Sequence, residues 1–313
     1  MTEQVLAIDV GGTKIAAALV DDEGRIGRET VQPTPESADA DAVFAGLEAA
    51  VRELLEPGAT TGPLRVGIGS AGPIDEPAGT VSPVNIGAWR GFPIVPRTRA
   101  VIKELTGTEP LVGLAGDGHC FALGEHWLGA GRDLDSIIGV VVSTGVGGGA
   151  VLRDRLVGGL TGNAVHLGHI TVDAWGGRCV CGGYGCVELY ARGPGMVAAA
   201  RQAGWTGGDD ARALTESARS GDPTAISVID RGMRALAAGL ATTATELDIP
   251  TVVLGGGVAK AGEVIFEPLR RHLRDFAVLP YVTGLEVRPA VLDNAGLLGA
   301  AALAFTLTPT STR

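Results

Sequence analysis

The sequence predicts an α/β protein built as two related lobes with a cleft between them. Two observations carry this prediction. An apolar strand, a glycine-containing turn and a second apolar strand follow one another twice, once near residue 9 and once near residue 144. The chain has 313 residues, a length suited to two domains. We expect one lobe from 1–115, completed by a helix in 295–313, and a larger lobe from 116–294 that contains a cysteine-rich loop.

Hydrophobic periodicity predicts the individual elements. Short apolar runs bounded by turn residues indicate buried strands, and apolar residues recurring every three to four positions indicate helices. The expected strands are 5–10, 15–20, 64–68, 110–114, 137–142, 150–156 and 251–254. The expected helices are 41–55, 98–106, 117–128, 211–219, 223–247 and 295–305. The last few residues, through Arg313, are expected to fray.

The composition excludes several classes of protein. The formal net charge of −10 disfavours binding to the phosphate backbone of a nucleic acid. There is no basic tract for an anionic membrane surface, no apolar run of about 18 residues, and no signal-peptide pattern at the start. We therefore expect a cytoplasmic protein without a nucleic-acid or membrane partner. In that compartment its four cysteines suit metal binding, catalysis or packing better than disulfides.

Three glycine-rich loops follow apolar strands and are candidate phosphate-binding loops. Glycine lets backbone N–H groups approach phosphate oxygens closely. Asp9 is suited to hold Mg²⁺ or its water, and Lys14 to neutralise phosphate. Any one of these loops taken alone is as well explained by an ordinary hairpin turn; three together favour phosphate binding. The loops are 9–14, 143–149 and 255–257.

Two familiar nucleotide-binding motifs do not explain the sequence. The GxxxxGK[ST] loop is absent. A GxGxxG pattern does occur at 67–72, but Pro73 and Pro77 follow it where a dinucleotide-binding motif would open a helix. A reading as an NAD-dependent oxidoreductase rests on this pattern alone, and the two prolines disfavour it.

Three of the four cysteines lie within eight residues of one another, as Cys179, Cys181 and Cys186, and His169 precedes them by ten residues. One imidazole and three thiolates make a closed tetrahedral zinc site, which would hold an irregular loop in place rather than catalyse a reaction. The alternative is a set of reduced thiols packed in a glycine-rich loop. Cys120 stands apart and is expected in the core.

These residues resemble the ROK family, a group of sugar kinases and sugar-responsive repressors. The resemblance extends over nearly the whole chain, and its most specific part is the spacing from His169 through Cys186 to Glu188. The other matching segments are 9–14, 70–75, Asn85, 116–117 and 143–145. It implies an actin-like, ribonuclease H-like ATPase fold, MgATP as co-substrate, a structural Zn²⁺ and a homodimer or homotetramer. The DNA-binding helical domain of the repressor members has no counterpart here.

The resemblance also implies roles for individual residues. Asp117 would be the catalytic base that accepts the proton of a primary hydroxyl. The implied substrate-binding residues are Gly72, Asn85, Gly116, Asp117, His166, His169 and Glu188. The implied ATP- and Mg²⁺-binding residues are Asp9, Gly11, Gly12, Thr13, Lys14, Thr144, Gly145, Gly255, Gly256 and Gly257. The implied zinc ligands are His169, Cys179, Cys181 and Cys186.

Each of these residues also has a structural interpretation. Asp117 would equally serve as the N-cap of its helix, and Lys14 as a solvated lysine at a hairpin tip. Asn85 suits a turn, Glu188 a surface carboxylate and His166 a plain loop position.

The sequence departs from the family pattern at three positions. Gly116 stands where the family usually has Asn, His119 where Asn is frequent, and His166 where the family's ExGH motif has Glu. In the family that Asn and Glu contact sugar hydroxyls. The departures favour a kinase of an amino sugar, a rarer hexose or a C7-cyclitol over a plain glucokinase. The alternative from another class is a catalytically silent sugar sensor, which retention of Asp9, Lys14 and Asp117 disfavours.

Overall fold

The computed structural model describes residues 3–55 and 63–308, so the fraying predicted through Arg313 falls outside the described residues. The described chain forms two compact units. Unit 1 comprises the residues up to 132, the segment 156–164 and the residues from 292 onward, and unit 2 comprises 133–155 and 165–291. These limits differ from the predicted lobes in three places, because 116–132, 156–164 and 292–294 belong to unit 1. In the first of them, helix α3 packs on helix α9. Within the described ranges, none of the helices has the length and apolar character needed to cross a membrane.

A mixed five-stranded sheet forms the centre of unit 1, in the order β3-β2-β1-β4-β7. The first three strands along the chain pair antiparallel, and β1, β4 and β7 run parallel. The strands are β1 (Gln4–Val10), β2 (Lys14–Asp21), β3 (Ile26–Pro33), β4 (Arg65–Ser70) and β7 (Leu111–Gly116), with a separate pair β5 (Ile74–Asp75) and β6 (Thr80–Val81). The helices are α1 (Ala40–Leu54), α2 (Ile94–Thr106), α3 (Asp117–Trp127) and α9 (Ala295–Thr306).

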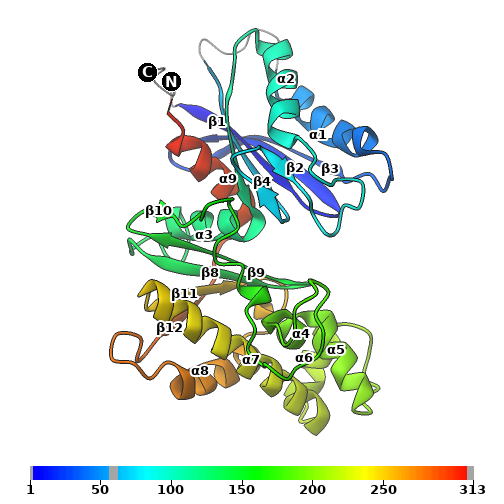
Figure 1. The fold of residues 1–313 in the computed structure, drawn as a ribbon, viewed down its shortest axis with the longest axis vertical. Coiled ribbons are helices and arrows are strands. Elements are labelled where there is room, and N and C mark those ends of the chain that lie inside the picture. The colour runs from blue at the N-terminus through cyan, green and yellow to red at the C-terminus, as the bar shows by residue number, and fades with distance from the viewer. Residues whose placement is uncertain (1–2, 56–62, 309–313) are drawn as a thin grey trace. The chain divides into compact units, whose positions relative to one another are not determined.

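Helices cover both faces of this sheet, with α1 and α2 on one side and α9 on the other (Figure 1). The alternation of side chains along β1 explains this, because Leu6 and Ile8 enter one apolar cluster and Val5 and Ala7 enter another that includes α9. The second cluster is tight: a Cβ added at Gly299 of α9 would stand 1.6 Å from the carbonyl oxygen of Cys120 in α3.

A buried carboxylate fixes the end of α3. Glu125 is fully buried, and its two oxygens accept hydrogen bonds from the N–H groups of Ala130, at 2.8 Å, and Leu292, at 2.9 Å. It therefore joins the turn after α3 to the chain that leads into α9. A buried carboxylate in this position stabilises the fold only while both N–H donors remain in place.

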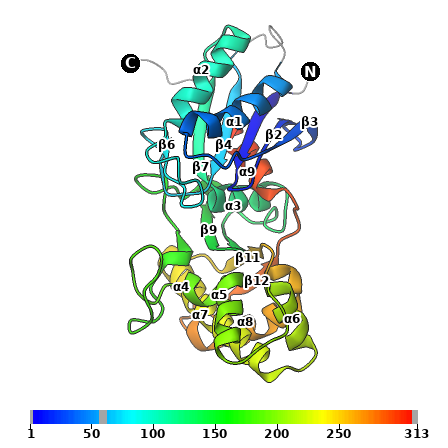
Figure 2. The same ribbon diagram turned by 90° about the vertical axis from the view of Figure 1, so that its right-hand side faces the viewer.

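The sheet of unit 2 has the same pattern, in the order β10-β9-β8-β11-β12. Here too the first two strands along the chain pair antiparallel, and β8, β11 and β12 run parallel. The strands are β8 (Ile137–Val142), β9 (Val146–Leu152), β10 (Arg155–Leu156), β11 (Thr251–Gly255) and β12 (Glu286–Pro289). The helices, gathered in Figure 2, are α4 (Val187–Ala191), α5 (Gly193–Gln202), α6 (Ala211–Arg219), α7 (Pro223–Leu247) and α8 (Glu263–Phe276), with short 3₁₀ turns η1 (Leu167–His169) and η2 (Ala259–Ala261).

The predicted elements differ from the structure most clearly after β8. The sequence predicts a glycine-rich loop over 143–149 and a returning strand over 150–156; the returning antiparallel strand is confirmed, but its predicted limits are wrong. The returning strand β9 begins at Val146, and Gly147, Gly148 and Gly149 lie inside it, paired with β8. Glycine in a strand can mark a close approach of another segment; a Cβ at Gly148 would stand 2.9 Å from the carbonyl oxygen of Val165.

Candidate functional site

In unit 1, Asp9 lies at the edge where β1 ends and is closely enclosed. Its side chain sits beside Gly69 of β4 and Gly296 of α9, and an added Cβ at Gly296 would come 3.0 Å from a carboxylate oxygen of Asp9. Burial, and secondly the charge of Asp117, raise the pKa of Asp9 from 3.8 to about 6, while Lys14 acts to lower it. A carboxylate whose negative charge is disfavoured in this way suits a position that a cation will occupy.

The first hairpin turn, residues 11–13, is closed by a hydrogen bond from the Gly11 N–H to the Lys14 carbonyl at 2.9 Å. Lys14 is exposed and is the first residue of β2. Asn85 lies over this turn, because a Cβ at Gly12 would stand 2.5 Å from its side-chain nitrogen. Asn85 belongs to a turn of its own, at a segment where the Val84 N–H bonds to the Gly72 carbonyl at 3.3 Å. The predicted residues Gly12, Gly72 and Asn85 therefore lie in one neighbourhood of unit 1.

Asp117 is the first residue of α3 and is exposed. Gly116 occupies the N-cap position, without a side-chain capping bond, so the interpretation of Asp117 as the N-cap is wrong. One carboxylate oxygen of Asp117 accepts the Gly118 N–H at 2.7 Å. Cys120, one turn further on, is fully buried as predicted. Burial, together with the charges of Asp9 and Asp117, raises the pKa of the Cys120 thiol, which keeps it neutral beneath the two carboxylates.

In unit 2, the turn 143–145 joins β8 to β9 and is held from two sides. The Ser143 N–H bonds to the Gly145 carbonyl, and the Gly193 N–H bonds to the Ser143 carbonyl, both at 2.9 Å. Thr144 is exposed at its tip. The third predicted loop begins at Gly255, the last residue of β11. Gly256 has φ of +93°, and a Cβ there would meet the Val142 carbonyl oxygen at 2.4 Å, so both its conformation and its surroundings require glycine.

Glu188 connects the cysteine-rich loop to the turn 143–145. It lies in α4, and its Oε2 atom accepts the N–H of Val146 at 2.9 Å. A Cβ at Gly145 would stand 2.9 Å from the same oxygen. The interpretation of Glu188 as a plain surface carboxylate is therefore wrong, because it is half-buried and holds the start of β9. Spacing along the sequence carried no signal for this contact, which joins residues 42 positions apart.

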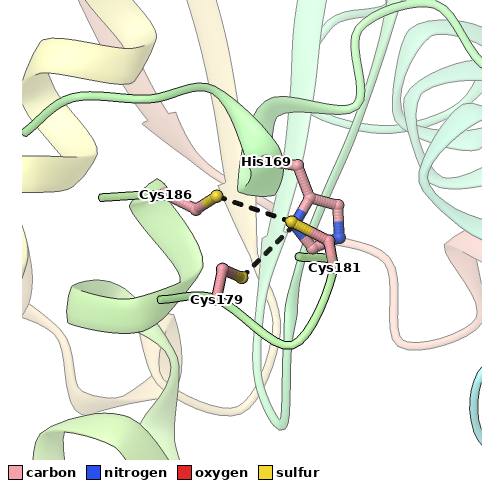
Figure 3. Close-up of side chains that lie close together, drawn as sticks. All are labelled: His169, Cys179, Cys181 and Cys186. Carbon is pink, nitrogen blue, oxygen red and sulfur yellow. Dashed lines mark hydrogen bonds between the residues drawn. The ribbon is translucent and has the colours of Figure 1, made fainter. Parts of the chain in front are cut away.

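The predicted metal ligands come together in unit 2 (Figure 3). The ligand atoms of His169, Cys179, Cys181 and Cys186 all lie within 4.8 Å of one another. The His169 Nδ1 is 3.8 Å from the Cys179 sulfur, and the Cys181 and Cys186 sulfurs are 3.7 Å apart. The Gly183 N–H points at the Cys181 sulfur at 3.4 Å and is the main cause that lowers the pKa of that thiol.

The two shorter separations, 3.7 and 3.8 Å, are close to the edges of a tetrahedral zinc site. Thiolates about 2.3 Å from zinc have sulfur–sulfur edges of about 3.8 Å, and an imidazole nitrogen at about 2.0 Å gives nitrogen–sulfur edges of about 3.5 Å. Backbone bonds shape the loop accordingly: the Cys179 N–H bonds to the Gly183 carbonyl at 2.8 Å, and the Val187 N–H bonds to the Ile170 carbonyl at 3.0 Å. The donor set and its geometry therefore suit a structural Zn²⁺ with four protein ligands.

His166 precedes the 3₁₀ turn η1 and His169 is its last residue; their ring centroids are 5.0 Å apart. The turn is held by the His169 N–H bonding to the His166 carbonyl at 3.0 Å. His166 is exposed, whereas His169 is half-buried with its Nδ1 directed at the thiols. Within unit 2 the structure thus brings His166, His169 and Glu188 close to the cysteines.

Comparison with known proteins identifies relatives along the whole chain. The model described as the ROK family matches residues 5–306. The chain is 40% identical over 301 residues to the N-acetylmannosamine kinase of Citrobacter koseri, across 96% of this chain and 98% of that one. The ROK hexokinase from Thermus thermophilus is similar in structure, with a TM-score of 0.78 and 36% identity over 97% of this chain and 98% of the other.

A second solved structure is the ROK family glucokinase from Streptomyces griseus in complex with glucose and AMPPNP. It has a TM-score of 0.77 and 33% identity over 97% of this chain and 99% of the other. These neighbours have the actin-like two-lobed fold, which confirms the predicted α/β fold class.

Proposed function

Because the chain belongs to the ROK family and is an ATP-dependent sugar kinase, we propose that it phosphorylates N-acetylmannosamine at its primary hydroxyl. The observation that carries this choice is the 40% identity, over almost the full length of both chains, to an N-acetylmannosamine kinase. Gly116 and His166, which stand where the family usually has Asn and Glu, support an amino sugar over glucose.

In this proposal Asp117 is the general base. Its carboxylate accepts the proton of the sugar hydroxyl as that oxygen bonds to the γ-phosphorus, and the bond between the γ-phosphorus and the β–γ bridging oxygen breaks to release ADP. Its exposure at the start of α3 supports this role, since a base must reach its substrate. MgATP enters as co-substrate, and a cation near Asp9 would favour the ionised form of a carboxyl whose pKa is about 6.

The remaining predicted residues are proposed to bind and position ATP and the sugar. Backbone N–H groups in the turns 11–13, 143–145 and 255–257 are proposed to hold phosphate oxygens, with Lys14 neutralising charge. Gly72, Asn85, His166, His169 and Glu188 are proposed to contact the sugar. The zinc ion would supply a fixed shape to the loop that carries His169 and Glu188, and takes no part in the reaction.

The proposal is tested with a panel of N-acetylmannosamine, glucose, mannose, glucosamine and a C7-cyclitol, each scored for ATP consumption. We expect kcat/KM for N-acetylmannosamine to exceed that for glucose by at least tenfold, and the product to carry its phosphate on the primary hydroxyl. A higher kcat/KM for glucose or the cyclitol would overturn the choice of substrate. Sugar binding without ATP consumption would favour a sensor.

A specific observation keeps glucose as a second candidate. The Streptomyces griseus glucokinase, which is described with bound glucose, is 33% identical to this chain over nearly its full length. The same panel separates the two candidates. A cytoplasmic location and a homo-oligomer remain part of the proposal.

A further inference from the structure

His119 makes a contact that ties α3 to a distant segment of unit 1. It is 3% exposed, and its Nε2 lies 2.9 Å from the carbonyl oxygen of Ala164. Because a carbonyl oxygen only accepts, Nε2 must carry the hydrogen. In the neutral ring, Nδ1 is then the unprotonated nitrogen. The imidazole is thereby fixed in orientation two residues after Asp117.

The other side of the same ring faces Gly116. A Cβ added at Gly116 would stand 3.1 Å from the His119 Nδ1 and 3.9 Å from its Cε1. The backbone at Gly116 has φ −67° and ψ 154°, an extended conformation that any residue can adopt. A Cβ at 116 would therefore press on the His119 ring, which would have to shift by a few tenths of an ångström, whereas the backbone itself admits any residue. The ring cannot easily withdraw, because Ala164 holds its far side.

Ala164 belongs to a segment that unit 1 holds at two points. Its neighbour Asn163 accepts the Ile74 N–H at 3.0 Å and donates to the Ile74 carbonyl at 2.6 Å. Ile74 begins β5, directly after the turn 70–73 that contains Gly72. Two consecutive residues of this segment are therefore anchored, Asn163 by Ile74 and Ala164 by His119. His166 follows Ala164 by two residues in the sequence.

We propose that His119 and Gly116 form a coupled pair that sets sugar selectivity, in which His119 is a positioning residue for the segment leading to His166. The imidazole crowds the place beside Asp117 where a side chain at 116 would begin, and its bond to Ala164 fixes the end of the unit 1 segment that precedes His166 in the sequence. The inference rests on the proposed function, since it takes Asp117 to be the base and His166 to be a sugar contact.

Two substitutions separate the two contacts of the ring. His119→Gln keeps a nitrogen near the Nε2 position and so keeps the bond to Ala164, but it removes the atoms that approach Gly116. His119→Asn keeps a polar atom near the Nδ1 position and is too short to reach Ala164. We expect His119→Asn to raise the KM for the sugar about tenfold with the KM for ATP unchanged, and His119→Gln to leave both within about threefold, the tenfold step corresponding to one lost hydrogen bond.

Stability measurements test the pair without using activity. Gly116→Ala is expected to lower the Tm when His119 is present and to be neutral or to raise the Tm when combined with His119→Gln, since alanine restricts the unfolded chain and the obstructing atoms are gone. Gly113→Ala, on the same strand, is the matched control: its Cβ would meet leucine side chains, Leu307 at 3.1 Å and Leu303 at 3.4 Å. Its effect on the Tm should be the same in both backgrounds.

Selectivity is measured in the double variant Gly116→Asn with His119→Gln. We expect its ratio of kcat/KM for glucose to that for N-acetylmannosamine to rise about tenfold over the wild-type ratio. Equal Tm changes for Gly116→Ala in the two backgrounds would overturn the coupling. An unchanged sugar KM in His119→Asn, or an unchanged ratio in the double variant, would overturn the positioning role. If the wild-type protein phosphorylates no sugar, the proposed function fails, and the Tm measurements still decide whether the pair is coupled.

Discussion

The two hairpin tips, residues 11–13 in unit 1 and 143–145 in unit 2, occupy the same place in two sheets of the same strand order, yet they are built differently. Charged side chains surround the first tip: Asp9 and Lys14 flank it, and Asp117 is close enough to raise the pKa of Asp9. The second tip has no ionisable residue of its own and is held through the Val146 N–H by Glu188, which lies two residues after Cys186.

This difference separates two ways of building the turns that we propose to bind phosphate. The first tip supplies charge, and the cost of enclosing that charge appears as the raised pKa of Asp9. The second supplies shape, and the Glu188 carboxylate, on a helix next to the cluster of His169 and the cysteines, maintains it. Substitutions that remove charge should therefore damage the first tip, and substitutions that remove a hydrogen-bond acceptor or the metal should damage the second.

The largest expected effect concerns the first tip, which charged side chains surround. Asp117→Asn keeps the shape of the side chain and removes the base, so kcat should fall by about 10²–10⁴ with sugar and ATP binding within a few fold. Steady-state kinetics and calorimetric binding check this. Asp22→Asn, an exposed carboxylate in the turn between β2 and β3, is the control and should retain kcat. A kcat within threefold of wild type for Asp117→Asn would remove it from the mechanism.

The next largest effect concerns the metal. We expect about one Zn²⁺ per chain by elemental analysis, and Cys186→Ala should lose it and lower the Tm by about 10 °C or more, because a structural metal contributes directly to folding. The matched control is Cys120→Ala, which removes a thiol outside the cluster and should keep the zinc. Full activity in a preparation free of zinc would contradict the assignment.

A third test uses pH to examine the charge at the first tip. With a pKa of about 6 in place of 3.8, native Asp9 holds a proton that the unfolded chain has released between these pH values. The free energy of unfolding should therefore fall as pH rises from about 4 to about 6, by up to about 3 kcal/mol, and stay level above. Asp9→Asn lacks this fall, so at pH 7 without MgATP it should be the more stable protein while having lower activity.

Urea unfolding at pH 4, 5, 6 and 7 measures the difference between Asp9→Asn and wild type. Asp22→Asn again serves as the control, because that exposed carboxylate lacks the enclosure of Asp9. Parallel curves of stability against pH for Asp9→Asn and wild type would show that Asp9 titrates near its ordinary pKa in solution.

The smallest expected effect concerns the hydrogen bond that Glu188 makes at the second tip. Glu188→Gln retains an oxygen that accepts the Val146 N–H, so the Tm should stay within about 2 °C of wild type. Glu188→Ala leaves that N–H without its partner, which costs about 1–3 kcal/mol and lowers the Tm by a few degrees. Thermal unfolding followed by circular dichroism suffices. If the two variants lose stability equally, the carboxylate charge rather than the acceptor holds the turn.

Local patterns in the sequence predicted most strands, several helices such as α7 and α9, and the grouping of His169 with three cysteines. Buried strands such as β1 and β8 are short apolar runs, and three cysteines within eight residues are a local signal. The prediction failed where composition misleads. The glycines in β9 indicate a loop, although backbone pairing with β8 makes them a strand. Helix α2 begins at Ile94, four residues before the predicted start, because Pro96 is tolerated in a first turn.

The contacts that complete the candidate site were beyond prediction for a different reason. The Glu188–Val146 bond, the His119–Ala164 bond and the enclosure of Asp9 by Gly296 join residues far apart in the sequence. Side-chain spacing reports only neighbours along an element, so such contacts depend on how the elements pack. The family resemblance pointed to Asp9, Glu188 and the position of His119 as candidates, without indicating which contacts hold them.

Helix α9 has a consequence for how the chain is made. It covers the face of β1 that carries Val5 and Ala7. Its last residue, Thr306, follows Arg132, where the first continuous part of unit 1 stops, by 174 residues (306 − 132). At about 5–20 residues per second, a ribosome takes roughly 9–35 seconds to supply it. During that interval α9 is not yet present to cover this apolar face of the nascent sheet. Unit 2, whose sequence precedes α9, is already synthesised by then. The order of synthesis thus makes unit 1, which begins first, the last to be completed.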